Sequence, residues 1–229
     1  MRRAVLLLVV VLVALVWTVG SIVVGRAKTS TIIGDSRDNQ LSGTPHSETM
    51  AGLYGDDRME GRGGNDRMTG KGGQDTMFGE GGDDEISGAS NGDKILGGFG
   101  IDKIHGGAGE DRLYGNEESD GLFGGEGDDE LFGGGGIDRL AGQEGDDQIT
   151  GGSGDDRLTG AEGKDVLKGE EGNDFIVGGV DPDHMFGGDG DDYIDAVDGT
   201  PGDTVDCGPG ANDVASVDAN DVVLNCEIY

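Results

Sequence analysis

The feature that most constrains this chain is a glycine that recurs every nine residues. From Gly34 to Gly187 every ninth residue is Gly, so eighteen consecutive nonads cover residues 34–195 without an insertion. The eighth place is always Leu, Ile or Met, and the sixth place is Asp in the last sixteen nonads. Segment 151–159, which reads GGSGDDRLT, shows the whole pattern. A register kept this strictly predicts a stack of similar structural units.

Each place in the nonad has a physical explanation. Gly at the first, often the second, and the fourth place allows positive φ and close backbone approach, so the first six residues are expected to form a tight turn. Places seven to nine, for example residues 157–159, form a short strand with its aliphatic side chain inward and its neighbours facing water. Two nonads complete one coil, with strands alternately in two facing sheets. The nonads therefore predict nine coils, stacked about 4.8 Å apart around two aliphatic ladders.

The charge of the chain indicates that such a roll needs a cation. Asp and Glu number 47 against 16 Lys and Arg, and the net charge is −31. A surface this acidic repels nucleic acid, so no nucleic-acid partner is expected, but it concentrates cations. Sixth-place carboxylates stack along each edge of the roll, and a thin apolar interior cannot offset their repulsion. Calcium suits these turns because it takes about six to eight oxygen ligands from carboxylates and carbonyls.

Residues 34–195 resemble the repeats-in-toxin (RTX) nonapeptide family, whose consensus is G-G-x-G-x-D-x-U-x. The resemblance implies a right-handed parallel β-roll in which calcium lies between successive turns on the same side, held by sixth-place Asp and by turn carbonyls. Pairing each such Asp with the one two nonads later gives up to about 14 calcium ions. The ligands implied in this way are Asp57, Asp66, Asp75, Asp84, Asp93, Asp102, Asp111, Asp120, Asp129, Asp138, Asp147, Asp156, Asp165, Asp174, Asp183 and Asp192.

The N-terminal part of the chain differs from the repeat. Residues 1–27 contain a positive start and a long apolar run, which is typical of an export signal; a retained single-pass membrane anchor is the alternative. Either interpretation places the rest of the chain outside the cytoplasm, secreted or tethered to the cell surface. Membrane contact is expected only if this segment stays uncleaved. Residues 28–51 are expected to form a cap with degenerate repeats, and residues 52–195 the calcium-binding roll.

The C-terminal part, residues 196–229, loses most of its Gly, gains Val and holds the only two cysteines, Cys207 and Cys226. An exported chain favours a disulfide between them, which would close a cap over the open end of the roll. Two free thiols or an intermolecular bridge are the alternatives. The tail also resembles the C-terminal segments of secreted hemolysin-type calcium-binding proteins. The predicted fold is thus an all-β, right-handed parallel β-roll of about nine 18-residue coils with a small disulfide-closed cap.

No catalytic centre is recognisable. Residues 88–92 read GASNG and fit the G-x-S-x-G motif, but Ser90 is the third place of a nonad, where the required strand and helix are not expected. His46, His105 and His184 do not form an H-E-x-x-H zinc motif. We therefore expect no enzyme activity. The expected function is that of an extracellular calcium-binding repeat protein that folds on calcium binding and acts as a structural or interaction module. The alternative that the resemblance implies is a toxin-like secreted effector.

Overall fold

The structure is a computed structural model that describes residues 21–22 and 30–228. The predicted export signal or anchor at residues 1–27 therefore lies outside the described residues, except for Ser21 and Ile22. Within the described part of the chain, no helix is long and apolar enough to cross a bilayer.

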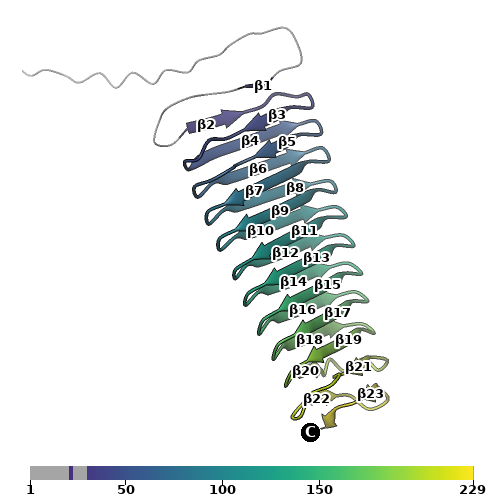
Figure 1. Ribbon diagram of the computed structural model, residues 1–229. Helices are drawn as coiled ribbons and strands as arrows, with labels where there is room; N and C mark the ends of the chain where they lie inside the picture. The colour runs from purple at the N-terminus through teal and green to yellow at the C-terminus, as the bar shows by residue number, and fades with distance from the viewer. Residues whose placement is uncertain (1–20, 23–29, 229) are drawn as a thin grey trace, which may run out of the picture.

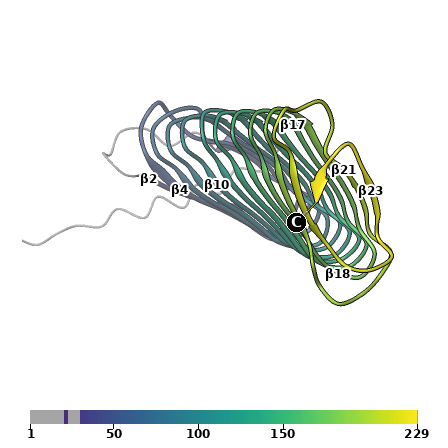
Figure 2. The same cartoon turned by 90° about the horizontal axis from the view of Figure 1, so that it is seen from below.

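The described chain forms a rod of two parallel β-sheets (Figure 1). Consecutive strands alternate between the sheets, and seen from below the coils lie one behind another (Figure 2). The odd sheet contains β1 (Ser21–Ile22), β3 (Gln40–Ser42), β5 (Arg58–Glu60), β7 (Thr76–Gly81), β9 (Lys94–Phe99), β11 (Arg112–Glu117), β13 (Glu130–Gly135), β15 (Gln148–Ser153), β17 (Val166–Glu171), β19 (His184–Asp189), β21 (Thr204–Asp206) and β23 (Val222–Leu224). The even sheet contains β2 (Ser30–Ile33), β4 (Glu48–Tyr54), β6 (Arg67–Gly72), β8 (Glu85–Ser90), β10 (Lys103–Ala108), β12 (Gly121–Glu126), β14 (Arg139–Glu144), β16 (Arg157–Glu162), β18 (Phe175–Val180), β20 (Tyr193–Ala196), β22 (Val214–Val217) and β24 (Glu227–Ile228).

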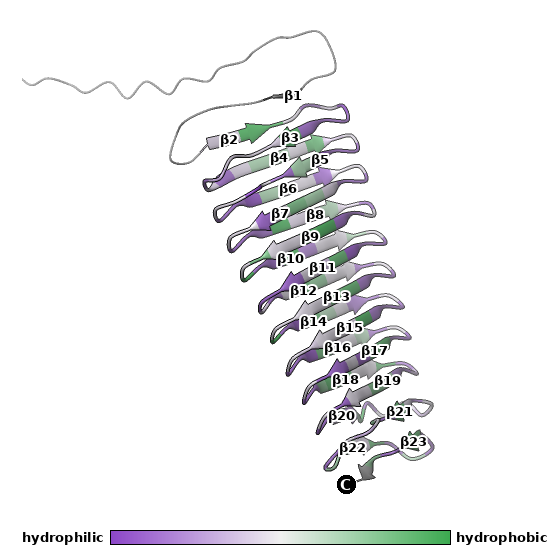
Figure 3. Ribbon diagram, in the orientation of Figure 1, coloured by the Kyte–Doolittle hydropathy of each residue, from purple (hydrophilic) through white to green (hydrophobic). Residues whose placement is uncertain are grey.

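The register of both sheets is set by the repeat. Ile104 lies opposite Leu122, which lies opposite Leu140, so each strand pairs with the strand two nonads later. The eighth-place side chains, from Leu41 to Ile194, are at most 2% exposed and form the interior between the sheets. Hydrophobic residues accordingly recur along the strands from the first coil to the last (Figure 3). The predicted all-β parallel roll with 18-residue coils and an aliphatic interior is confirmed.

The strands are longer than predicted, and this changes the role of the first glycine. β10 has six residues and includes Gly106, the first place of its nonad. Gly106 is buried and does not have positive φ, whereas Gly107 at the second place (φ 125°) and Gly109 at the fourth (φ 128°) do. The expectation of positive φ at the first place is therefore wrong. The backbone takes positive φ at the second and fourth places, and the first-place glycine lies inside the strand.

The roll has about 11 turns, more than the nine that the nonads predict. The difference arises because the chain on both sides of residues 34–195 adds strands in register. β2 pairs with β4 at one end, while β21 pairs with β19 and β22 pairs with β20 at the other. The valines and alanines of the tail therefore extend the two sheets, and the tail covers the end of the nonads with further coils.

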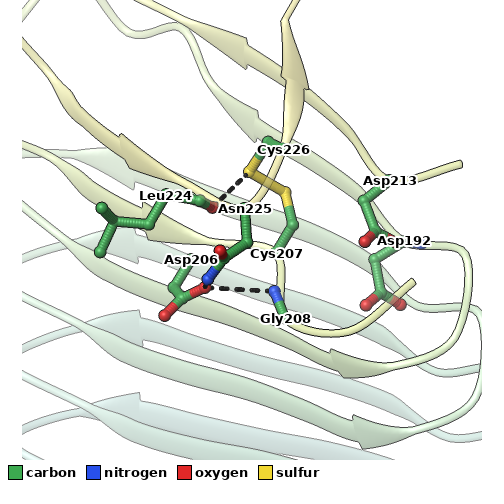
Figure 4. The surroundings of a disulfide bond; sticks show 8 residues. All are labelled: Asp192, Asp206, Cys207, Gly208, Asp213, Leu224, Asn225 and Cys226. Carbon is green, nitrogen blue, oxygen red and sulfur yellow. Dashed lines mark hydrogen bonds between the residues drawn. A yellow bond between two sulfur atoms is a disulfide. The ribbon is translucent and has the colours of Figure 1, made fainter. Parts of the chain in front are cut away.

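A disulfide joins Cys207 and Cys226 at the C-terminal end of the rod, with their Cα atoms 5.3 Å apart (Figure 4). Cys207 follows β21, and its backbone N–H donates a hydrogen bond of 3.1 Å to the carbonyl of Leu224. Cys226 directly precedes β24. The predicted pairing of the two cysteines is confirmed, and the bond connects two successive coils of the tail.

The outer face of the odd sheet is less polar than predicted. Phe78, Leu96, Tyr114 and Phe132 occupy the ninth place in four successive coils and are all half-buried. The rings of Tyr114 and Phe132 stack with centroids 5.0 Å apart, and the guanidinium of Arg58 lies 4.3 Å from the centre of the Phe78 ring. Because neighbouring strands are only about 4.8 Å apart, apolar side chains at the same place cover one another without entering the interior.

Candidate metal centre

The sixth-place aspartates form two ladders, one along each edge of the rod. The first ladder lies where the chain enters odd-numbered strands and consists of Asp57, Asp75, Asp93, Asp111, Asp129, Asp147, Asp165 and Asp183. The second ladder lies where the chain enters even-numbered strands and consists of Asp66, Asp84, Asp102, Asp120, Asp138, Asp156, Asp174 and Asp192. The structure thus places all the predicted ligands in two rows, each beside the Asp two nonads away. All of these side chains are at most 4% exposed.

One carboxylate oxygen of each ladder aspartate joins neighbouring coils. The Oδ1 atom accepts a hydrogen bond of 2.6–2.9 Å from the backbone N–H of the residue at the sixth place one coil earlier. Asp147, for example, accepts from the N–H of Asp129 at 2.8 Å. This structural role was not predicted from the sequence. The tendency of Asp and Asn side chains to accept backbone N–H groups in turns was the signal that could have found it.

The other carboxylate oxygen has no partner among the described residues. The Oδ2 atoms of fifteen ladder aspartates, all except Asp183, are buried and accept no hydrogen bond. A buried carboxylate oxygen without a partner is costly, so each one calls for a proton or a cation. Each Oδ2 faces the first-place glycine of its own nonad, where a Cβ would overlap it; Gly142 and Asp147 are one such pair. The recurring Gly and the recurring Asp are therefore parts of one feature.

These rows fit a hard divalent cation. In the described part of the chain, no three His, Cys, Asp or Glu side chains converge on one point, so the carboxylates occur as successive pairs along a ladder. Backbone oxygens lie beside them: a Cβ on Gly106 would lie 2.8 Å from the carbonyl oxygen of Gly124 and would overlap Oδ2 of Asp111. Calcium accepts such a mixture of carboxylate and carbonyl oxygens. When bound, it would supply the positive charge that the ladders lack.

Burial raises the pKa of the ladder carboxyls. In Asp93, Asp102 and Asp147, burial together with the charge of neighbouring ladder carboxylates raises the pKa to about 8, although the hydrogen bond from the preceding coil lowers it. Burial likewise raises the pKa to about 7 in Asp66, Asp120, Asp129, Asp156 and Asp183. It raises the pKa to about 6 in Asp57, Asp84, Asp111, Asp165 and Asp174. Without a cation, burial thus favours the protonated form of these carboxyls more than it is favoured in an exposed Asp.

Surface grooves run beside both ladders. One groove follows the first ladder and is lined in part by Asp75, Asp93 and Asp111. Another lies beside the second ladder at Asp66 and Asp84. The carboxylates themselves are buried between the turns, at the edge of these grooves.

The ladders have distinct beginnings. Asn39 and Glu48 occupy the sixth place in the first two nonads, and their backbone N–H groups donate to Asp57 and Asp66. Their side-chain oxygens also have local partners: Oδ1 of Asn39 accepts from the N–H of Asp35 at 2.7 Å, and Oε2 of Glu48 accepts from a turn N–H at 2.8 Å. The first two nonads thus lack the free oxygen found at the later places.

Two further aspartates continue the ladders beyond the nonads, and the sequence analysis missed both. Asp203 (2% exposed) accepts the N–H of Asp183 at 2.8 Å, and Asp213 (4% exposed) accepts the N–H of Asp192 at 3.0 Å. The spacings of 20 and 21 residues break the nine-residue frame, so counting from Gly34 did not find them. The available signal was an Asp placed two residues before an inward-facing apolar side chain, as in the last sixteen nonads.

The G-x-S-x-G match does not form a nucleophile elbow. Ser90 ends β8, and its hydroxyl donates a hydrogen bond of 2.6 Å to the carbonyl of Lys71. A turn and then strand β9 follow it, where the motif requires a helix. His105 stacks on the ring of Phe123, with centroids 4.8 Å apart.

A parallel solenoid whose turns carry stacked, buried carboxylates defines the β-roll class of calcium-binding proteins. The family model for the RTX calcium-binding nonapeptide repeat matches the chain over residues 42–77, 60–95, 87–122, 96–131, 132–167 and 168–200. The chain therefore belongs to the RTX family and is a calcium-binding repeat protein. No curated protein matches it.

Proposed function

We propose that this protein is an extracellular structural or interaction module that becomes ordered when calcium binds, and that the aspartates from Asp57 to Asp192 are its calcium ligands. The observation that carries this proposal is the row of fifteen buried Oδ2 atoms without a partner. Each ladder brings like charges close together in a medium of low dielectric, where only protons or cations can neutralise them. At neutral pH and sufficient calcium, the cation takes this place.

The ion count follows from the ladders. Each aspartate can share an ion with its neighbour one coil away, which gives up to about 14 ions along the nonads. That many divalent ions would nearly balance the net charge of −31. Calcium binding then supplies folding free energy, because the paired carboxylates exist only in the folded roll. The chain would be disordered where calcium is scarce and rigid where it is plentiful.

Two features support an extracellular location. Disulfides persist in oxidising compartments, and Cys207 and Cys226 are paired. The apolar segment within residues 1–27 has the composition of an export signal or anchor. RTX repeat proteins are also typically secreted, and their β-roll is a structural calcium-binding fold.

The test is far-UV circular dichroism of residues 28–229, first in EDTA and then in millimolar calcium. We expect the spectrum of a disordered chain in chelator and a β-sheet spectrum after calcium is added. Mass spectrometry under native conditions then counts the bound ions. A well-ordered roll that persists in strong chelator with no ions detected would contradict the proposal.

A further inference from the structure

The second ladder does not stop where the nonads stop. Asp192 is its last sixth-place residue, is 2% exposed, and has an Oδ2 atom that is buried without a partner among the described residues. Asp213 lies one coil further on and accepts the N–H of Asp192 at 3.0 Å (Figure 4). The same hydrogen bond joins successive aspartates throughout the ladder. Asp192 therefore has a ladder neighbour on both sides, Asp174 and Asp213.

Cys207, one of the two disulfide cysteines, provides a backbone oxygen beside Asp192. At most first-place glycines followed by a sixth-place Asp, the space that a Cβ would occupy is bounded by Oδ2 of that Asp and by the carbonyl oxygen of the glycine two nonads later. A Cβ on Gly187 would overlap Oδ2 of Asp192 and the backbone oxygen of Cys207. The carbonyl of Cys207 thus occupies the place of a glycine carbonyl, and the bond to Cys226 holds it there. The same oxygen also accepts the N–H of Gly188 at 3.2 Å.

A glycine, Gly210, also lies directly beside the Asp213 carboxylate. A Cβ on Gly210 would overlap both carboxylate oxygens of Asp213 and the carbonyl oxygen of Gly190. Gly210 therefore leaves room for this carboxylate, as the first-place glycines do for theirs. The geometry differs from that of the nonads, because Gly210 lies closer in sequence to its Asp and faces the carbonyl of the preceding coil; what the two have in common is a missing Cβ beside the carboxylate.

We propose that Asp192, Asp213 and the backbone carbonyl of Cys207 form one further calcium site, which closes the second ladder against the disulfide. The proposal deepens the proposed function, because it rests on the ladders being calcium ligands. The family match ends at residue 200, so Cys207 and Asp213 lie beyond it. An ion at this site ties the disulfide-closed tail to the last nonad.

The first test counts calcium ions by native mass spectrometry in protein expressed from the full sequence. Asp213→Asn keeps an oxygen that can accept the N–H of Asp192 but removes the charge. We expect it to bind one ion fewer than the wild type. The matched control is Asp189→Asn, since Asp189 is an exposed acid in β19 whose side chain makes no hydrogen bond within the described residues. The control should bind as many ions as the wild type.

A second variant tests the site from the other side. If the tail site exists, Asp192→Asn removes two ions, one shared with Asp174 and one shared with Asp213; if the ladder ends at Asp192, it removes only one. The proposal is overturned if folded Asp213→Asn binds the wild-type number of ions, or if Asp192→Asn loses a single ion. Should Asp213→Asn lack a β signal, the count for Asp192→Asn decides. A wild type that binds no calcium at all would instead refute the proposed function.

Discussion

The substitution Gly142→Ala tests why a glycine opens every nonad. Gly142 lies within β14 and does not have positive φ, so an alanine there meets no backbone strain. Its Cβ would overlap Oδ2 of Asp147 and would lie 2.6 Å from Cγ of the same residue. Asp147 is fully buried. The substitution therefore forces the carboxylate out of its place in the ladder.

The expected cost combines two effects. Overpacking of a tight interior costs about 1–3 kcal/mol. Displacing Asp147 also breaks its 2.8 Å hydrogen bond from the N–H of Asp129, and leaving that buried donor unpaired costs about 1–3 kcal/mol. We expect Gly142→Ala to lower the free energy of unfolding by about 2–6 kcal/mol in total. If the ladder aspartates bind calcium as proposed, the substitution should also remove the two ions that Asp147 would share with Asp129 and Asp165.

Gly135→Ala is the matched control. Gly135 lies at the third place, in β13, without positive φ, and the nearest atom to an added Cβ is Oγ of Ser153 at 3.4 Å. The alanine fits, and it reduces the freedom of the unfolded chain, so this variant should be neutral or gain about 0.4–1 kcal/mol.

The assay is urea unfolding of the calcium-saturated variants by circular dichroism, with hydrogen exchange of the Asp129 amide as a local probe. The local probe is needed because solenoids open in parts. Gly142→Ala should unfold at lower urea and exchange Asp129 faster than Gly135→Ala. Equal midpoints and equal exchange rates in the two variants would refute our explanation of the first-place glycine.

Three further predictions concern charge, packing and the tail. In EDTA, the raised pKa values of the ladder carboxyls mean that the folded roll binds protons more tightly than the unfolded chain does. The stability of the metal-free roll is then greatest below about pH 4 and is lost as the pH rises through about 6 to about 8. A β signal in chelator should therefore appear on acidification and not at pH 8. Leu131→Ala should destabilise the calcium-loaded roll by about 2–5 kcal/mol, because Leu131 is fully buried and its loss leaves a cavity. Phe132→Ala should lose about 0.5–1.5 kcal/mol of stacking in addition to partial apolar burial, and it leaves no internal cavity. A melting temperature lower for Phe132→Ala than for Leu131→Ala would contradict the assignment of inner and outer faces. Replacing Cys207 and Cys226 by Ser should lower the free energy of unfolding of the tail by about 3 kcal/mol. Backbone amides of β22 should then exchange faster, while those of β10 stay unchanged. Faster exchange along the whole rod would contradict a local effect of the disulfide.

The repeat made most of the fold predictable. Because the frame never slips between residues 34 and 195, one nonad defines the neighbours of all the others, and the inward Leu131 and the stacked Asp129 followed directly. Periodicity does not say where the backbone of the neighbouring coil lies. For that reason the hydrogen bond from the Asp129 N–H and the overlap between Gly142 and Asp147 could be found only in the structure.

The tail was harder to predict for a different reason. Extra residues between Asp192 and Asp213 lengthen the turn, so the frame is lost although the strands stay in register. A rule based on spacing fails there, whereas the local pattern of an Asp before an inward apolar residue persists.

The alternation of strands between two sheets restricts how the length of such a rod can vary. Loss of a single nonad, for example residues 142–150, would move every later strand to the opposite sheet and every later carboxylate to the opposite edge. Loss or duplication of two nonads would leave both faces and both edges unchanged and alter the length by about 4.8 Å. Loss of a single nonad between Phe78 and Phe132 would likewise divide the row that these residues form between the two sheets, whereas loss of a whole coil would shorten the row and keep it on one face.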